Sequence, residues 1–134
     1  MKRIEMVYKR LKDNLISTLE EDKQYYVGAA CIDHKGQIIS IGYNSYKKTH
    51  PEQKRFTIKN DNKDRCFLHA EIAALVKTRK KPYGIMVMRM LGNNDVRMAK
   101  PCRICEMALK EAGIEQVWYT DKDGILRCYY LRRI

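Results

Sequence analysis

The sequence lacks several features that would define other classes of protein. It has no uninterrupted apolar stretch of about 18 residues, the length that a membrane-spanning helix requires. Basic residues follow Met1, but no apolar run comes after them, so we expect no signal peptide and a cytoplasmic protein. The cysteine count of five is odd, which argues against a closed disulfide framework and fits a reducing compartment.

Internal repeats and low-complexity tracts are also absent. With 134 residues, of which 45% are hydrophobic, the chain can bury a core without disulfides. We therefore expect a single domain over 1–134. The formal charge is +11, from 27 Lys and Arg against 16 Asp and Glu. This charge favours a polyanion or a phosphorylated small molecule as ligand, but a plain Lys-rich surface would give the same count.

Hydrophobic periodicity predicts alternating helices and strands. The predicted helices cover residues 3–20, 68–78 and 102–112. The predicted strands cover residues 25–32, 37–43, 83–91, 114–120 and 125–131. Turn signals fall at 33–36, 92–95 and 121–124, and the last of them indicates an antiparallel C-terminal hairpin. This order implies an α/β fold with a mixed sheet and helices on its faces.

Residues 44–67 have almost no apolar periodicity and are rich in lysine and arginine. A loop of this length inside a compact domain is usually functional or disordered.

Two short motifs carry the chemistry. His69 and Glu71 stand at the start of one predicted helix, and Pro101, Cys102 and Cys105 stand at the start of another. Thiols three positions apart in a first helical turn reach one point, and His69 can supply a third ligand. Zn²⁺ takes such sulfur and nitrogen ligands, and three protein ligands leave a position for water. Glu71 can then act as proton acceptor without binding the metal.

The pattern H-x-E followed by P-C-x-x-C is typical of zinc deaminases. On His-Ala-Glu at 69–71 and Pro-Cys-Arg-Ile-Cys at 101–105, the chain resembles the cytidine/deoxycytidylate deaminase superfamily over residues 25–124. The resemblance implies a three-layer α/β/α cytidine deaminase-like fold on a five-stranded mixed sheet. It also implies one zinc ion per subunit, hydrolytic removal of an exocyclic amine, and assembly as a homo-oligomer, either dimer or tetramer.

The same resemblance implies several substrate contacts. Asn44 matches the asparagine with which relatives hold the sugar or the base edge, although a turn-forming role is the alternative. The backbone N–H of Ala70 matches the donor to the base carbonyl. Ala29 is expected near the floor of the pocket, and Pro101 beside it.

The substrate itself is less well defined. With a histidine as its first expected ligand, the chain resembles the deoxycytidylate, tRNA-adenosine and polynucleotide cytosine deaminases. Among these, Ala73 favours the tRNA type over the deoxycytidylate type. The short turn at 121–124 instead resembles the branch that acts on free nucleosides and nucleotides, and we give it more weight. Lys48, Thr49 and His50 could gather the phosphate of a free nucleotide such as dCMP.

Two other functions remain open. Tyr46 and Phe56, interleaved with basic residues, could instead track single-stranded DNA or RNA, including tRNA. A catalytically silent, zinc-containing nucleic-acid-binding protein is the third possibility. Cys31 and Cys128 lie in predicted strands and are expected to be buried, and His34 is expected to be exposed. A second zinc site from His50 and Cys66 is an alternative that the sequence allows.

Overall fold

The computed structural model describes residues 2–19, 25–45, 51–53, 55 and 69–131. Its helices are α1 (Lys2–Ile16), α3 (Ala70–Lys77) and α4 (Arg103–Glu111). Its strands are β1 (Tyr26–Ile32), β2 (Ile38–Tyr43), β3 (Gly84–Met90), β4 (Val96–Arg97), β5 (Gln116–Thr120) and β6 (Leu126–Tyr130). Within the predicted 44–67 loop, residues 51–53 and 55 are helical, which the sequence did not indicate.

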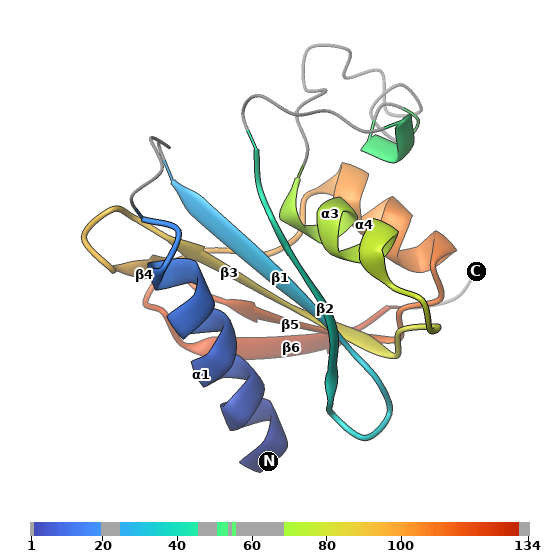
Figure 1. The fold of residues 1–134 in the computed structure, drawn as a ribbon, viewed down its shortest axis with the longest axis horizontal. Coiled ribbons are helices and arrows are strands. Elements are labelled where there is room, and N and C mark those ends of the chain that lie inside the picture. Colours follow the sequence, from blue (N-terminus) through green and yellow to red (C-terminus); the bar gives the residue numbers. More distant parts are fainter. Residues whose placement is uncertain (1, 20–24, 46–50, 54, 56–68, 132–134) are drawn as a thin grey trace.

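The strands form one mixed sheet in the order β2-β1-β3-β5-β6, with β4 paired to the end of β3 (Figure 1). β3 and β5 are parallel, and β5 and β6 form the predicted antiparallel hairpin. The α/β fold is therefore confirmed. The described residues contain six strands where five were expected, because Val96 and Arg97 pair with the end of β3. Two residues are too few to show the alternation that identifies a strand in a sequence.

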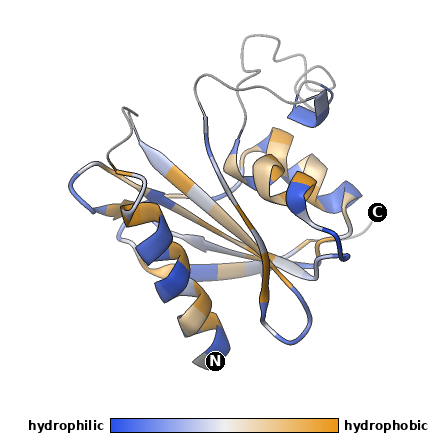
Figure 2. Ribbon diagram, viewed as in Figure 1, coloured by the Kyte–Doolittle hydropathy of each residue, from blue (hydrophilic) through white to orange (hydrophobic). Residues whose placement is uncertain are grey.

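The helices cover the two faces of the sheet, so that the molecule has three layers (Figure 1). α1 lies on one face, where Val7, Leu11 and Leu15 are buried. They pack against alternate residues of β3, namely Met86, Met88 and Met90. α1 mixes hydrophilic and hydrophobic residues along its length (Figure 2), as a helix does when one side covers a sheet and the other meets solvent. α3 and α4 lie on the opposite face.

Gly42 lets α3 lie unusually close to the sheet. A Cβ atom at this position of β2 would lie 2.3 Å from the backbone nitrogen of Ala74 and 2.7 Å from the carbonyl oxygen of Ala70. Ala29, the register partner of Gly42 on β1, is fully buried on the same side. These small residues set the depth at which α3 sits, and hence the position of the residues at its start.

Two hairpin turns share one design. The Oδ1 atom of Asp33 accepts hydrogen bonds from the N–H groups of Lys35 and Gln37, each at 2.9 Å. In the β5–β6 turn, Asp121 Oδ1 accepts from the N–H groups two and four positions later, also at 2.9 Å. A glycine with φ near +80° follows in each turn, at Gly36 and Gly124. The turns predicted at 33–36 and 121–124 are confirmed.

α1 ends at Ile16, four residues before the predicted end. Beyond it, the N–H groups of Thr18 and Leu19 donate to carbonyls only three positions back. The hydroxyls of Ser17 and Thr18 also donate to carbonyls three positions back, at 2.6 and 2.7 Å. Hydroxyl groups that bond to the preceding turn compete with the helical pattern and close the helix early.

Cys31 is buried, as predicted, and His34 is exposed. The expectation for Cys128 was wrong, because this thiol is exposed. Cys128 lies on β6, at the edge of the sheet, opposite Trp118 of β5. α1 packs over β1 and β3, so it does not cover β6 on that face of the sheet.

Candidate metal centre

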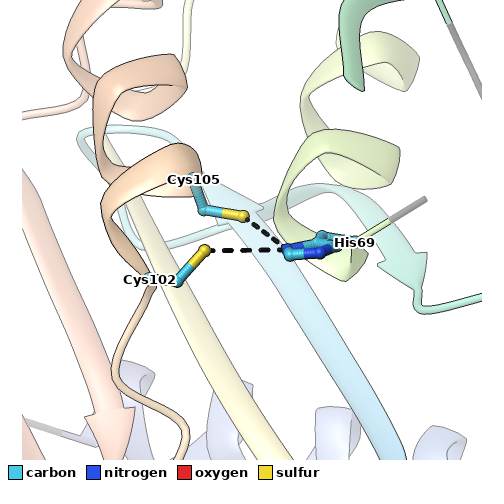
Figure 3. A group of neighbouring side chains, drawn as sticks. All are labelled: His69, Cys102 and Cys105. Atoms are coloured by element: carbon cyan, nitrogen blue, oxygen red, sulfur yellow. Dashed lines mark hydrogen bonds between the residues drawn. The ribbon is translucent and has the colours of Figure 1, made fainter. Parts of the chain in front are cut away.

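The three predicted metal ligands lie at the starts of the two neighbouring helices. His69 is the residue before α3, and Cys102 is the residue before α4; both have extended backbone angles. The helical hydrogen bonds begin at once, from Ala73 N–H to His69 O at 3.0 Å and from Glu106 N–H to Cys102 O at 2.8 Å. Cys105 follows in the first turn of α4. The side chains of the three residues point toward one another (Figure 3).

The distances within this cluster suit a single metal ion. The Nδ1 atom of His69 lies 3.2 Å from Cys105 Sγ and 3.8 Å from Cys102 Sγ, and all three ligand atoms lie within 4.8 Å of one another. Zn–N and Zn–S bonds of about 2.0 and 2.3 Å in a tetrahedron separate such ligand atoms by about 3.6 Å. One imidazole nitrogen and two thiols are also the donor types that zinc prefers.

The two thiols differ in protonation because they share a hydrogen bond. Hydrogen bonding from the Cys105 thiol lowers the pKa of Cys102, and His69 lowers it further. The same hydrogen bond, together with burial, raises the pKa of Cys105. Cys102 is therefore the thiolate of the pair, while Cys105 keeps its proton in the metal-free protein. Binding of a metal by both sulfurs releases that proton.

Glu71 is a buried carboxyl group beside the three ligands. Its exposed fraction is 6%, and burial raises its pKa above the usual value for glutamate. The carboxyl is close enough to the Cys105 thiol for a hydrogen bond between them. A buried carboxyl with a raised pKa accepts a proton more readily than an exposed one.

The small residues expected to border the substrate lie in the core near the metal centre. Ala29 and Ala70 belong to one cluster of buried residues that also includes Val87 of β3. Pro101 is buried directly before Cys102. The structure therefore brings β1, the start of α3 and β3 together at this point.

Asn44 holds the beginning of β1. Its Oδ1 atom accepts from the N–H of Val27 at 3.0 Å, and its Nδ2 group donates to the carbonyl of Tyr25 at 3.2 Å. Its backbone N–H donates to the carbonyl of Val27 at 3.1 Å. Both amide atoms of an asparagine can make a second hydrogen bond, so this anchoring leaves room for a ligand. The expected contact of Asn44 with the substrate stays a prediction.

Lys48, Thr49 and His50 lie outside the described residues, and so does Cys66 of the alternative second zinc site.

Arg89 is a candidate ligand-binding residue that we did not identify from the sequence. It lies on β3 two positions after Val87, so its side chain is on the same face of the sheet. Its guanidinium carbon lies 3.9 Å from the centre of the Tyr25 ring. Its buried Nε atom has no hydrogen-bond partner among the described residues. The signal was present, because Arg89 is the one charged residue in the otherwise apolar run 83–91.

Tyr129 was also missed. This β6 residue packs against the buried cluster that contains Ala29 and Ala70. Its hydroxyl donates to Glu106 Oε2 of α4 at 3.2 Å, and its ring meets that of Tyr119 edge-on with centroids 5.8 Å apart. Burial and the neighbouring Glu106 raise the pKa of Tyr129, so the phenol stays protonated. It ties the C-terminal hairpin to the helix that carries both cysteine ligands.

Comparison with known proteins identifies the family and the fold. The family model described as the cytidine and deoxycytidylate deaminase zinc-binding region matches residues 2–121. A crystal structure of cytidine deaminase from Mycobacterium leprae is 16% identical, with a TM-score of 0.54, covering 90% of this chain and 92% of that one. Cytidine deaminase from Mycobacterium tuberculosis is 18% identical, with a TM-score of 0.50 and coverages of 84% and 82%. At these identities the likeness shows a shared fold.

No curated protein sequence matches the chain significantly. Among the described residues, none of the helices is long and apolar enough to cross a membrane.

Proposed function

The chain belongs to the cytidine and deoxycytidylate deaminase zinc-binding family, and from this premise we propose that it deaminates a free cytosine nucleotide such as dCMP. The products are the corresponding uracil nucleotide and ammonia. The observation that carries the proposal is the buried Glu71 carboxyl beside a His-Cys-Cys ligand set. A purely structural zinc site would use four protein ligands and would not need this carboxylate.

His69, Cys102 and Cys105 would hold the zinc ion. When bound, zinc supplies a Lewis acid that lowers the pKa of a water molecule towards about 7. Glu71 takes a proton from the attacking water and gives it to the ring nitrogen next to C4 of cytosine. The water oxygen bonds to C4, and Glu71 takes the remaining proton of that oxygen and passes it to the amine. The C4–N bond then breaks, ammonia leaves, and C4 becomes a carbonyl. One buried carboxyl with a raised pKa thus serves as base and then as acid.

Arg89 supports a phosphorylated substrate. A partly buried guanidinium is costly unless it meets a negative charge, and the ion pairs of the described residues do not include Arg89. Arg89 is the register partner of Val27, whose backbone is bound by Asn44. Asn44 and Arg89 therefore flank one residue of β1, where the first could contact the sugar and the second the phosphate. Lys48, Thr49 and His50 would add to this anion site.

We further propose that the protein acts on this small nucleotide in the cytoplasm, as one domain over 1–134. As the family resemblance implies, it would assemble into a homo-oligomer. Tyr25 and Arg89 together could also stack and bind a segment of single-stranded DNA or RNA, which keeps a polynucleotide deaminase as the second candidate.

A substrate panel tests the proposal. The purified zinc-loaded protein is incubated with dCMP, CMP, deoxycytidine, cytidine and cytosine-containing single-stranded DNA and RNA, and uracil is measured by mass spectrometry. Adenine and guanine compounds are included. We expect conversion of the free cytosine nucleotides, and none by the Glu71→Gln variant prepared in parallel. Conversion of polymers alone would favour the second candidate, and a zinc-loaded protein that converts nothing would favour the silent binding protein.

A further inference from the structure

Gln53 contacts the backbone of a metal ligand. Its Oε1 atom accepts a hydrogen bond from the backbone N–H of His69 at 3.0 Å. Gln53 has no exposed surface, so this amide is fully enclosed. Sixteen positions separate the two residues in the sequence, and most of the intervening segment lies outside the described residues. Nothing in the metal-binding motifs accounts for this contact.

The contact supplies a hydrogen-bond acceptor that α3 itself does not provide at its N-terminus. His69 is the N-cap of α3, and the N–H of an N-cap has no partner inside the helix. In many helices a glutamate or glutamine at the third helical position reaches back to this N–H. That position is Ile72 here, whose side chain cannot accept a hydrogen bond. Gln53 supplies the acceptor from a different segment.

The segment that carries Gln53 is itself fastened to the other ligand-bearing helix. We call residues 51–53 and 55 the bracket. Arg55 Nη2 donates to Glu52 Oε2 at 2.7 Å and to Glu111 Oε1 at 2.8 Å. Glu111 is the last residue of α4, and Cys102 and Cys105 stand at the opposite end of that helix. The bracket therefore connects the start of α3 with the end of α4.

We propose that Gln53 is a positioning residue of the metal centre, which holds the His69 backbone so that Nδ1 faces the two cysteine sulfurs. The hydrogen bond fixes the main chain at the point from which the imidazole projects. The Nδ1 atom lies 3.2 and 3.8 Å from the two sulfurs, which is close enough for one ion to reach all three ligand atoms. Removing a partner that hydrogen-bonds to a ligating side chain typically costs about 10- to 100-fold in metal affinity, and we expect an effect of this order for a partner that holds the backbone of a ligand residue.

The test compares Gln53→Leu with Ser40→Ala. Leucine is close to glutamine in size but accepts no hydrogen bond. Ser40 Oγ donates to the carbonyl of Ala74 at 2.8 Å, so Ser40→Ala removes a side-chain hydrogen bond to the same helix, away from the ligands. Zinc dissociation constants are measured by competition with a chromophoric chelator. The visible spectrum of the cobalt(II) form reports the ligand geometry, and urea unfolding reports stability.

We expect Gln53→Leu to weaken zinc binding by about 10- to 100-fold and to alter the cobalt spectrum. Ser40→Ala should lose stability while zinc affinity and spectrum stay as in the wild type. Gln53→Glu keeps an acceptor oxygen at the same distance and should recover affinity relative to Gln53→Leu. Wild-type zinc affinity in Gln53→Leu, or equal losses of affinity in Gln53→Leu and Ser40→Ala, would overturn the proposal.

If Gln53→Leu does not fold, Gln53→Asn carries the test with the same criteria, because its amide is one methylene too short to reach His69. None of these measurements uses a substrate. Their outcome is therefore independent of whether the protein deaminates a nucleotide.

Discussion

Gly42 of β2 and Ala74 of α3 are so close that a single added carbon atom does not fit between them. A Cβ at Gly42 would meet the Ala74 nitrogen at 2.3 Å, and the backbone of a helix cannot yield as a flexible side chain can. The same Cβ would lie 2.7 Å from the carbonyl oxygen of Ala70, at the start of α3. The position of His69 and Glu71 therefore depends on the absence of a side chain at residue 42.

We expect Gly42→Ala to displace α3, to destabilise the fold by about 1–3 kcal/mol or more, and to weaken metal binding. Urea unfolding and zinc content after dialysis measure the two effects. Gly92→Ala is the matched control, because a Cβ there meets nothing within 4 Å. A Gly42→Ala protein with wild-type stability would mean that α3 can shift without cost.

Glu71→Gln should bind zinc normally but lose activity. The amide fills the same buried space, yet it cannot take a proton from water, and general acid–base groups contribute about 10²- to 10⁴-fold to rate. Ammonia release and zinc content are measured on the same preparation. Activity close to wild type would remove Glu71 from the mechanism.

Cys102→Ser should lose most of its zinc. A serine hydroxyl is a poor zinc ligand, and Cys102 is the sulfur whose lowered pKa makes it the thiolate of the pair. Atomic absorption on the dialysed protein gives the metal content. Cys128→Ser, which changes an exposed thiol of β6, is the control and should keep its metal.

Arg89→Ala should discriminate between nucleotide and nucleoside. Loss of a charged hydrogen bond to phosphate should lower kcat/KM for dCMP by about 10- to 100-fold, and kcat/KM for deoxycytidine should change little. Arg97, the register partner of Arg89 on β4, is already paired with Asp95 at 3.2 Å, so Arg97→Ala controls for the loss of one positive charge. Equal losses on both substrates in Arg89→Ala would contradict the phosphate contact.

The β5–β6 hairpin should give the protein a pH-dependent part of its stability. The hydrogen bond from Arg127 lowers the pKa of Asp121 below its ordinary value of 3.8, and backbone N–H groups of the turn lower it further. The unfolded chain thus binds a proton at higher pH than the folded one. The stabilisation is complete above about pH 4 to 5 and is lost as the pH falls through the lower, folded pKa.

Asp121→Asn should therefore be less stable than the wild type at pH 7, and the difference should shrink below pH 4. Urea unfolding at several pH values measures it. Asp123→Asn is the control, because it removes an acidic side chain from the same turn and keeps the backbone N–H that donates to Asp121. A difference that is constant from pH 7 to pH 2.5 would show that the charge of Asp121 does not contribute.

The sequence predicted those features that depend on short-range patterns. The hairpin turns follow from Asp and Gly at fixed offsets, and β1, β2, β3, β5 and β6 follow from apolar runs between turn signals. The candidate metal ligands could be named from the sequence because each motif is local, at 69–71 and at 101–105, and because their joint occurrence resembles a known family. The structure adds that the three candidate ligand atoms lie within 4.8 Å of one another.

Contacts between distant segments could not be predicted in this way. Gln53 lies in a polar segment without periodicity, and no rule of spacing links its amide to the N–H of His69. The early end of α1 depends on hydroxyl groups whose hydrogen bonds compete with the helix. The exposure of Cys128 depends on which strands α1 covers, and a strand pattern alone does not contain this information.

The separation of the ligands along the chain has a further consequence for folding. His69 and Cys102 are 33 positions apart, and α3, β3 and β4 lie between them. An ion bound to both acts as a cross-link that closes this loop, and closing a loop of that size in the unfolded chain costs about 3–4 kcal/mol in conformational entropy. Because this entropy cost opposes binding by the unfolded chain, zinc binds the folded chain more tightly and stabilises it as a whole. Removal of zinc should therefore destabilise the molecule well beyond the site itself.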